Sequence, residues 1–346
     1  MLSGGRASLA TARAGRSSVW PLRVPRTVAL IGAPQQYGQP QSGVHKGPAL
    51  LRAAGMRKIA AGLRWHVEDL GDVDMEAGPE AATSPSKAGR RAARHAATIG
   101  AGSRRLFEAC RAAHGDGRLV LTMGGDHSIA LGTVAAALSA RPETRVLWVD
   151  AHADANSPAT SPSGNMHGMP LAFLLGLVDA ASLGEEAPFF EWLLDEGGPR
   201  LAPERLAYVG LRDVDDSERC TLRALAGRGA YVSSMHDVDK YGIGRVVDEA
   251  LGHLGYGGEG APPPLHLSFD VDACDPLIAP ATGTAVRGGL SFREAHFVCE
   301  AAAATGALGS LDIVEVNEAL SDVRGADDTV QLAAGLVASA LGDSIL

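Results

Sequence analysis

The sequence contains six short apolar runs, each about as long as one buried strand. Helix-like stretches lie between them, among them residues 129–138 and 292–305. Strands that alternate with helices predict a parallel sheet with helices on both faces, which is an α/β fold. The runs occupy residues 27–32, 119–124, 146–150, 206–211, 265–270 and 311–316.

The 346 residues are expected to form one folded domain, because a single α/β unit can exceed about 250 residues. Loops richer in Gly, Pro and Glu, at 184–204 and 255–264, indicate surface excursions within that domain and not linkers. Aromatic residues are only 5% of the chain, whereas Ala and Gly are abundant, which favours close packing of helices on a sheet. No apolar stretch approaches the roughly 20 residues of a membrane span, so we expect none.

Charge is distributed unevenly along the chain. The first 67 residues carry ten Lys and Arg and no acidic residue, although the net charge of the whole chain is −9. The remainder is therefore strongly acidic, which argues against a nucleic-acid partner and suits a cationic substrate. Residues 1–24 are Arg-rich, contain Ser and lack acids, the composition of an organelle transit peptide, with a disordered tail as the alternative.

The chain has four cysteines, and none of them forms a C-x-x-C motif. This spacing predicts a reduced compartment, with neither a disulfide framework nor a thiolate zinc site. The four residues are Cys110, Cys220, Cys274 and Cys299.

Acidic residues and histidines gather at the ends of five of the apolar runs. Ligands of parallel sheets bind beyond the carboxyl ends of the strands, so these residues are expected to meet at one edge. G-G-D-H-S follows Met123, and D-A-H-A-D follows Val149. R-D-V-D-D follows Leu211, D-V-D-A-C-D-P follows Phe269, and Glu315 lies within the last run.

The motifs D-A-H-A-D and D-V-D place ionisable side chains two residues apart, which in extended backbone points them to one face. Carboxylates so close repel each other, and burying them unpaired is costly. No Lys or Arg is adjacent to either motif, so we predict a metal ion between them. The candidate ligands are His127, Asp150, His152, Asp154, Asp270 and Asp272.

Four carboxylates and two imidazoles are enough for two divalent ions. Oxygen-rich coordination with some imidazole favours Mn²⁺ or Mg²⁺ over structural Zn²⁺. Two such ions can hold a bridging water and lower its pKa toward neutrality, which would supply a hydroxide for hydrolysis.

Each motif alone has a simpler explanation. The Asp of G-G-D-H-S fits a helix cap, and Asp270 with Asp272 fits a turn before Pro276. The metal interpretation depends on their joint occurrence at one sheet edge.

Together, G-G-D-H-S, D-A-H-A-D-A-N and S-F-D-V-D-A-C-D-P resemble the ureohydrolases, manganese enzymes that include arginase, agmatinase and formimidoylglutamase. The resemblance covers nearly the whole chain, and residues 161–171, 210–215 and 280–284 are similar to arginases. It implies a single domain over residues 25–346, a parallel, mostly eight-stranded sheet and a homotrimer. The basic extension most resembles the mitochondrial animal form, so we expect a mitochondrial location, or otherwise a cytoplasmic one.

The same resemblance implies a role for each residue of the site. One Mn²⁺ would be held by His127, Asp150, Asp154 and Asp270, and the other by His152, Asp150, Asp270 and Asp272. Asp154 would orient the hydroxide, His167 would be the general acid or base and Glu315 would pair with the guanidinium. For substrate binding it implies Asn156, Ser163 and Asn165 at the carboxylate, Asp215 and Glu218 at the ammonium, and Thr284 at the guanidinium end. Alone, His167 would read as an ordinary surface histidine.

The implied reaction is hydrolysis of the L-arginine guanidinium to L-ornithine and urea by a hydroxide between two Mn²⁺ ions. An agmatinase or another guanidino-substrate ureohydrolase, a non-catalytic relative and a metal-dependent deacylase are the alternatives. The chain departs from the family pattern at Cys274, which adds a thiol that oxidation could reach, at Glu318, where Pro is usual, and at His45, where an acid is usual.

Overall fold

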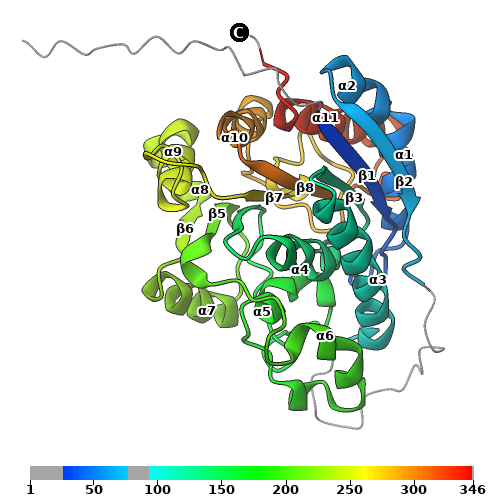
Figure 1. Cartoon of the computed structure of the whole chain (residues 1–346), viewed down its shortest axis with the longest axis vertical. Helices are drawn as coiled ribbons and strands as arrows, with labels where there is room; N and C mark the ends of the chain where they lie inside the picture. The colour runs from blue at the N-terminus through cyan, green and yellow to red at the C-terminus, as the bar shows by residue number, and fades with distance from the viewer. Residues whose placement is uncertain (1–25, 77–92, 345–346) are drawn as a thin grey trace, which may run out of the picture.

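The computed structural model describes residues 26–76 and 93–344, and its centre is one sheet of eight parallel strands (Figure 1). The strand order is β2-β1-β3-β8-β7-β4-β5-β6, with all neighbours parallel. The strands are β1 Thr27–Ala33, β2 His66–Asp72, β3 Leu119–Gly124, β4 Arg145–Val149, β5 Leu206–Leu211, β6 Tyr231–Ser234, β7 Leu265–Asp270 and β8 Leu308–Val314.

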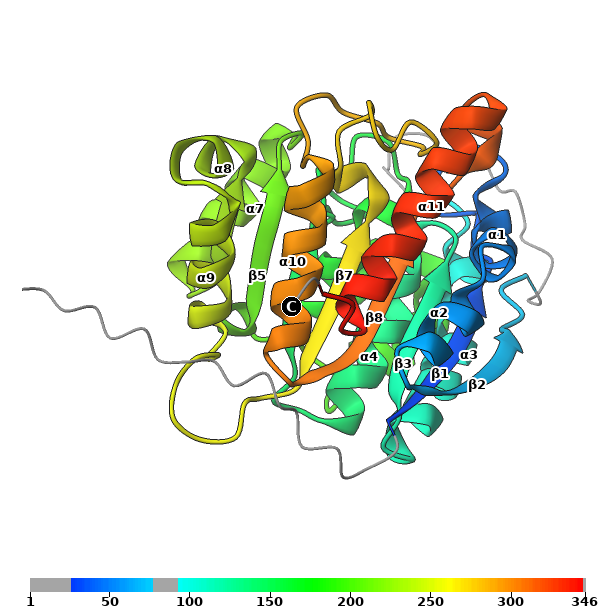
Figure 2. The same ribbon diagram turned by 90° about the horizontal axis from the view of Figure 1, so that it is seen from above.

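Helices cover both faces of the sheet because both faces of its central strands are apolar. In β4, Leu147 and Val149 pack with α1, α2 and α8 to α11, whereas Val146 and Trp148 pack with α3, α4, α5 and α7. Figure 2 shows α9, α10 and α11 lying over the first of these faces. The helices are α1 Gly47–Ala53, α2 Met56–Gly62, α3 Ala96–Gly115, α4 Ala130–Ala140, α5 Pro170–Leu174, α6 Glu191–Leu194, α7 Asp216–Gly227, α8 Met235–Tyr241, α9 Ile243–His253, α10 Phe292–Ala304 and α11 Val323–Ala340.

All six strands predicted from apolar runs are present, and the α/β prediction is confirmed. Sequence reasoning missed β2 and β6, the two edge strands. The segment H-V-E-D-L-G-D of β2 is largely exposed, and β6 has only four residues, so neither carries the continuous apolar signal of a central strand. The last predicted run is shifted, because β8 ends at Val314, before Glu315.

The pairing register brings the ends of the central strands level with one another. Val149 of β4 is opposite Phe269 of β7, and Asp270 is opposite Val314 of β8. The residues that follow β3, β4, β7 and β8 therefore emerge side by side at the carboxyl edge of the sheet, where a ligand site is expected.

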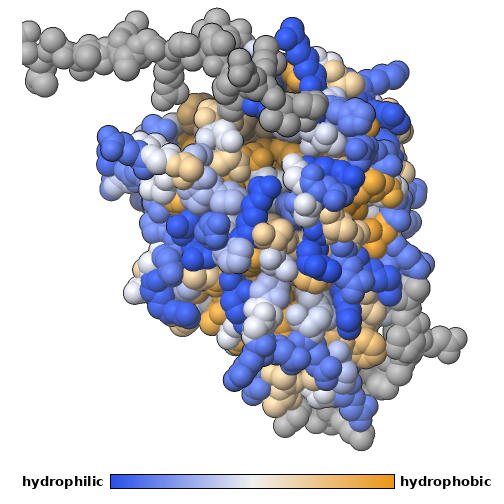
Figure 3. Space-filling model, in the orientation of Figure 1, coloured by the Kyte–Doolittle hydropathy of each residue, from blue (hydrophilic) through white to orange (hydrophobic). Residues whose placement is uncertain are grey.

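The predicted surface excursion at 184–204 contains the short helix α6 and 3-10 turns. It is not wholly on the surface, because Phe190, Leu193 and Leu201 are buried in the same hydrophobic cluster as Trp148 of β4. Hydrophilic residues are interspersed with smaller hydrophobic patches on the face in Figure 3. Within residues 26–76 and 93–344, no helix combines the length and apolarity needed to cross a bilayer. The predicted transit segment, residues 1–24, lies outside the described residues.

Candidate active site

His127 is the centre of the first group of predicted metal ligands. Its Nδ1 lies 3.0 Å from Asp150 Oδ2, 3.2 Å from Asp154 Oδ2 and 3.3 Å from Asp270 Oδ2. This nitrogen is buried and has no partner of hydrogen-bond geometry, while Nε2 lies 2.9 Å from Ser268 Oγ. One ring nitrogen carries at most one proton, so it cannot satisfy three carboxylates, whereas a cation among them can.

His152 is the centre of the second group. Its Nδ1 lies 3.3 Å from Asp150 Oδ1 and 3.1 Å from Asp272 Oδ2. Two sets of ligand atoms are thus close enough to hold an ion: one from His127, Asp150 and Asp154, the other from Asp150, His152 and Asp272. Asp150 belongs to both sets, as predicted for a bridging carboxylate. Asp270 lies beside His127 but falls outside both sets, so its bridging role stays a prediction.

The backbone that presents these ligands is not the extended one expected from spacing. β4 ends at Val149, and the chain then turns, with the His152 N–H donating to Asp150 Oδ1 at 2.7 Å and Asp154 at φ 48°. A 3-10 turn, Val271–Ala273, likewise follows Asp270 and is closed by Asp272 N–H to Asp270 Oδ1 at 2.8 Å. Short Asp side chains favour such turns, which is why the ligands converge without a strand.

Burial and mutual repulsion govern the charge of this cluster. Burial, reinforced by Asp150, raises the pKa of Asp154 to about 6. Burial also raises the pKa of Asp270 and Asp272 above the ordinary value. Burial opposes ionisation of Asp150 too, but the adjacent imidazoles of His127 and His152 outweigh it and lower the pKa of that carboxyl. The carboxylates therefore need positive charge, as metal ligands do.

Glu315 and His167 meet beside the first group. Glu315 is 1% exposed, accepts from the His127 backbone N–H at 2.9 Å through Oε1, and lies 3.5 Å from His167 Nδ1. Its Oε2 is buried without a hydrogen-bond partner. Glu315 also has φ 66°, a left-handed conformation that is costly for a non-glycine residue and is found at functional sites. Burial opposes charging of His167, but Glu315 outweighs it and raises the pKa to about 9.

The predicted substrate-binding residues line a cavity of about 130 Å³. Asn156 Nδ2 donates to Asp215 Oδ2 at 2.7 Å, and Thr284 Oγ1 donates to Asp272 Oδ2 at 2.8 Å. Burial and the nearby Asp154 raise the pKa of Glu218 to about 7. Glu315 is not among the lining residues, but it lies 3.5 Å from His167, which is one of them. The residues that line this cavity include His152, Asp154, Asn156, Ser163, Asn165, His167, Asp215, Glu218, Asp270 and Thr284.

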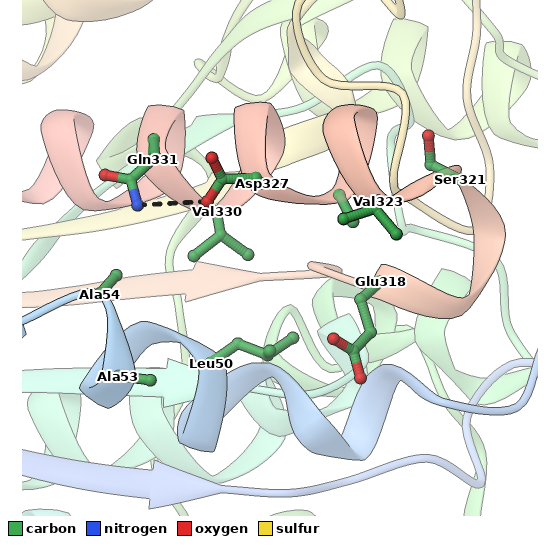
Figure 4. Close-up of a pocket in the computed structure, with 10 residues that line it drawn as sticks. Leu50, Ala53, Ala54, Glu318, Ser321, Val323, Asp327, Val330 and Gln331 are labelled. Atoms are coloured by element: carbon green, nitrogen blue, oxygen red, sulfur yellow. Dashed lines mark hydrogen bonds between the residues drawn. The ribbon is translucent and has the colours of Figure 1, made fainter.

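A larger cavity, of about 390 Å³, lies between α1 and α11 (Figure 4). Its walls carry Leu50, Val323 and Val330 with two acids, Glu318 and Asp327. Glu318 is already paired with Lys46 at 3.0 Å. Its lining residues include no histidine, so the smaller cavity holds the arrangement suited to chemistry.

Supporting residues were missed in the sequence. Trp148 stacks on His127 at 4.1 Å between ring centroids and donates from Nε1 to Asp150 Oδ2. Ser268 bonds His127. Asp126 was expected to be a cap, and it does cap the turn after it while also accepting from the Gly38 N–H. Trp148 and Ser268 each precede a ligand by two residues, which is a signal that they share its face of the sheet.

No Lys or Arg is adjacent to the Asp motifs in sequence, but the fold brings an arginine to one of them. Arg212, which follows β5, donates from Nη2 to the backbone oxygen of Asp272 at 2.6 Å. It is far from that motif in sequence and reaches it only through the fold. At Cys274, burial raises the thiol pKa, which makes the thiolate unfavourable and lowers the expected reactivity toward oxidants.

Known proteins match this sequence and fold. The arginase family model matches residues 26–342. The arginase of Glaciozyma antarctica is 43% identical over 325 residues, which cover 94% of this chain and 90% of that protein. The solved structure of Bacillus caldovelox arginase has a TM-score of 0.81 at 33% identity and covers 93% of this chain and 100% of that chain. The structure of Entamoeba histolytica arginase in complex with L-ornithine has a TM-score of 0.76 at 28% identity. It covers 92% of this chain and 99% of that chain. The chain therefore belongs to the arginase family of hydrolases.

Proposed function

We propose that the chain hydrolyses the guanidinium of L-arginine to L-ornithine and urea at the 130 Å³ cavity, with two Mn²⁺ ions as cofactors. The observation that carries this proposal is the pair of His–Asp ligand sets that share Asp150. A shared carboxylate between two imidazole-containing sets is the arrangement expected of a two-metal hydrolase.

The residues fit the proposed ions. His127 Nδ1 is buried and without a hydrogen-bond partner, and the surrounding donors are mostly carboxylate oxygens with no Cys in either set. That donor set favours Mn²⁺ or Mg²⁺ over structural Zn²⁺, and the resemblance to arginases favours Mn²⁺ of the two. His127, Asp150, Asp154 and Asp270 would hold one ion, and Asp150, His152, Asp270 and Asp272 the other. Two such ions, when bound, would supply one chemical function: they would lower the pKa of a coordinated water toward neutrality.

Glu315 is assigned to the guanidinium. That group stays protonated at any ordinary pH, and a carboxylate matches it with two parallel hydrogen bonds. The free Oε2 of Glu315 is available for this purpose. Asp154 lies at the boundary between the ligand sets and the cavity, where its carboxylate can accept a proton from the attacking oxygen.

His167 is assigned to the leaving group. Its pKa of about 9 keeps the ring protonated at neutral pH, so it can give a proton to the departing nitrogen. As the carbon–nitrogen bond breaks, that proton leaves ornithine with an amine and the remaining carbon becomes urea.

The cavity wall is assigned to the amino-acid head group. Asn156, Ser163 and Asn165 bind the carboxylate, directly or through water, and Asp215 with Glu218 binds the ammonium. A wall built for those polar groups is left with unpaired partners when agmatine, which lacks the carboxylate, binds instead. Selection for arginine follows from that penalty.

We further propose that residues 25–346 form the catalytic domain and that the chain assembles as a homotrimer.

A separate proposal concerns residues 1–24, which we expect to direct the chain to mitochondria, as in the animal form. The support for import is compositional: Arg6, Arg13, Arg16 and Arg23 without any acid. Import of a fluorescent fusion carrying residues 1–24 would test this, with all four arginines changed to Gln as the control.

The first test of the function is urea release by the Mn²⁺-loaded chain from L-arginine and from agmatine in parallel. Turnover of arginine alone supports the reaction and the head-group assignments. Turnover of agmatine alone keeps the metal site but refutes the roles of Asn156, Ser163, Asn165 and Asp215. Activity on neither, with two ions bound, refutes the proposed reaction.

A further inference from the structure

Arg212 is the first residue after β5, and it touches both segments that supply the second ligand set. Its backbone N–H donates to the Ala151 carbonyl at 2.9 Å, between Asp150 and His152. Its Nη2 donates to the Asp272 carbonyl at 2.6 Å. Of the set Asp150, His152 and Asp272, Arg212 therefore bonds Asp272 itself and the residue that lies between the other two.

Within the described residues, the Arg212 guanidinium donates to backbone carbonyl oxygens. Nη1 bonds Ala273 O at 3.1 Å and Gly210 O at 3.4 Å, and Nη2 also bonds Cys274 O at 3.2 Å. Nη2 and Nε both bond Val286 O, at 2.7 and 3.2 Å. A planar guanidinium with five N–H donors can link so many acceptors, whereas a lysine ammonium has three donors at one point.

These contacts join three segments that are separated along the chain and lie together only in the folded protein. They are the end of β5, the turn over residues 272–274, and the segment around Val286 that follows Thr284. The third segment matters because Thr284 Oγ1 donates to Asp272 Oδ2 at 2.8 Å. Arg212 thus holds the backbone of Asp272 while the segment it anchors holds the carboxylate.

The surroundings of the guanidinium are closely built. A Cβ added to Gly289 would lie 2.6 Å from Arg212 Nη2 and 2.6 Å from the carbonyl carbon of Cys274. Only glycine leaves room for the side chain at that point. No hydrogen bond from the Arg212 side chain goes to His127, Asp150 or Asp154, the members of the first set, among the contacts of the described residues.

We propose that Arg212 is a positioning residue for the second metal ion: its guanidinium fixes the turn that carries Asp272, and its loss weakens that ion selectively. Residues that orient metal ligands typically change metal affinity by about 10- to 100-fold when removed. The inference rests on the proposed two-metal function.

The test is titration of the metal-free, full-length chain with Mn²⁺, following bound metal per chain and the spin-coupled Mn²⁺ pair by electron paramagnetic resonance. The variants are Arg212→Lys and Arg212→Ala. Arg212→Lys keeps the positive charge but loses the planar set of five N–H donors. Arg219→Met is the matched control, because Arg219 is an exposed arginine paired with Asp216 on α7. Thermal unfolding of each metal-free chain shows whether it folds.

We expect wild type and Arg219→Met to bind two ions and show the coupled pair. In both Arg212 variants the weaker ion should dissociate about 10- to 100-fold more readily, the tighter ion should change by less than about threefold, and the coupled signal should be lost at low Mn²⁺. Methylguanidinium, but not methylammonium, should restore the second ion to Arg212→Ala and leave wild-type affinity unchanged.

Unchanged affinity for both ions in Arg212→Lys and Arg212→Ala would overturn the role of Arg212, and so would equal weakening of both. If Arg212→Ala does not fold, Arg212→Lys decides the question. Fewer than two ions in the wild type would instead contradict the proposed metal pair, so the two failures are distinguishable.

Discussion

Glu315→Gln is the most informative single substitution, because it removes a charge and almost nothing else. The amide oxygen can still accept from the His127 N–H, which Oε1 accepts at 2.9 Å in the native chain. The position of Oε2, buried and without a hydrogen-bond partner, becomes an amide N–H₂ that donates instead of accepting. A guanidinium, which has only donors, then meets a donor.

The magnitude follows from burial. Glu315 is 1% exposed, so its interaction with the substrate cation is little screened. Breaking a buried, hydrogen-bonded charge pair costs about 2–5 kcal/mol. At about 1.4 kcal/mol for each tenfold, kcat/KM for arginine should fall about 30- to 5,000-fold.

Urea release over a range of arginine concentrations measures kcat/KM, and Glu318→Gln is the matched control, since Glu318 is a partly exposed acid paired with Lys46. Glu315 raises the pKa of His167 to about 9, so the alkaline limb of the kcat/KM profile should also move to lower pH in the variant. A Glu315→Gln enzyme within threefold of wild type, with its alkaline limb in place, would refute the assignment.

Three further outcomes are expected. Chelation of divalent ions should lower the melting temperature, because the clustered carboxylates lose their counter-charge. Mn²⁺ at 100 times its Kd should restore about 2.7 kcal/mol of the free energy of unfolding. An unchanged melting temperature in calorimetry would contradict this. Burial raises the pKa of Glu218 from 4.5 to about 7, so ionising it costs stability as pH rises through that window. In urea denaturation, the free energy of unfolding of Glu218→Gln should therefore exceed that of wild type by up to about 3 kcal/mol at pH 8 and by nothing at pH 4. An equal effect at both pH values would contradict this prediction. Asn156→Ala should raise KM for arginine about tenfold, for one lost hydrogen bond to a charged group, without changing that for agmatine; equal losses would remove Asn156 from head-group recognition.

The central half of the fold could be read from the sequence, and the edges could not. β3, β4 and β7 are buried on both faces, so their apolar runs are continuous and unmistakable. β2 is an edge strand with exposed polar residues, and its pairing depends on β1 being present. Local pattern therefore carries no information about it, because its stability comes from a neighbour.

The ligand motifs show the same division in finer detail. The sequence predicted that His127, Asp150, His152, Asp154, Asp270 and Asp272 lie together, because residues that follow apolar runs of a parallel sheet share its carboxyl edge, and the structure brings these six side chains together. The further expectation, that extended backbone points the residues of each motif to one face, was wrong, since the chain turns at Asp154 and at Val271–Ala273. Side-chain bonds to the backbone decide such turns, and an alternating pattern does not reveal them.

By itself the sequence determined the alternation of strands and helices, the chemical kind of site and its acidic character, because these depend on residue type and on order along the chain. Only the tertiary structure decided which side chains touch. It gave Asp150 to both ligand sets, left Glu315 Oε2 without a hydrogen-bond partner and brought Arg212 to the Asp272 turn. Those relations join residues from different strands, and the register and packing that set their distances are properties of the assembled sheet.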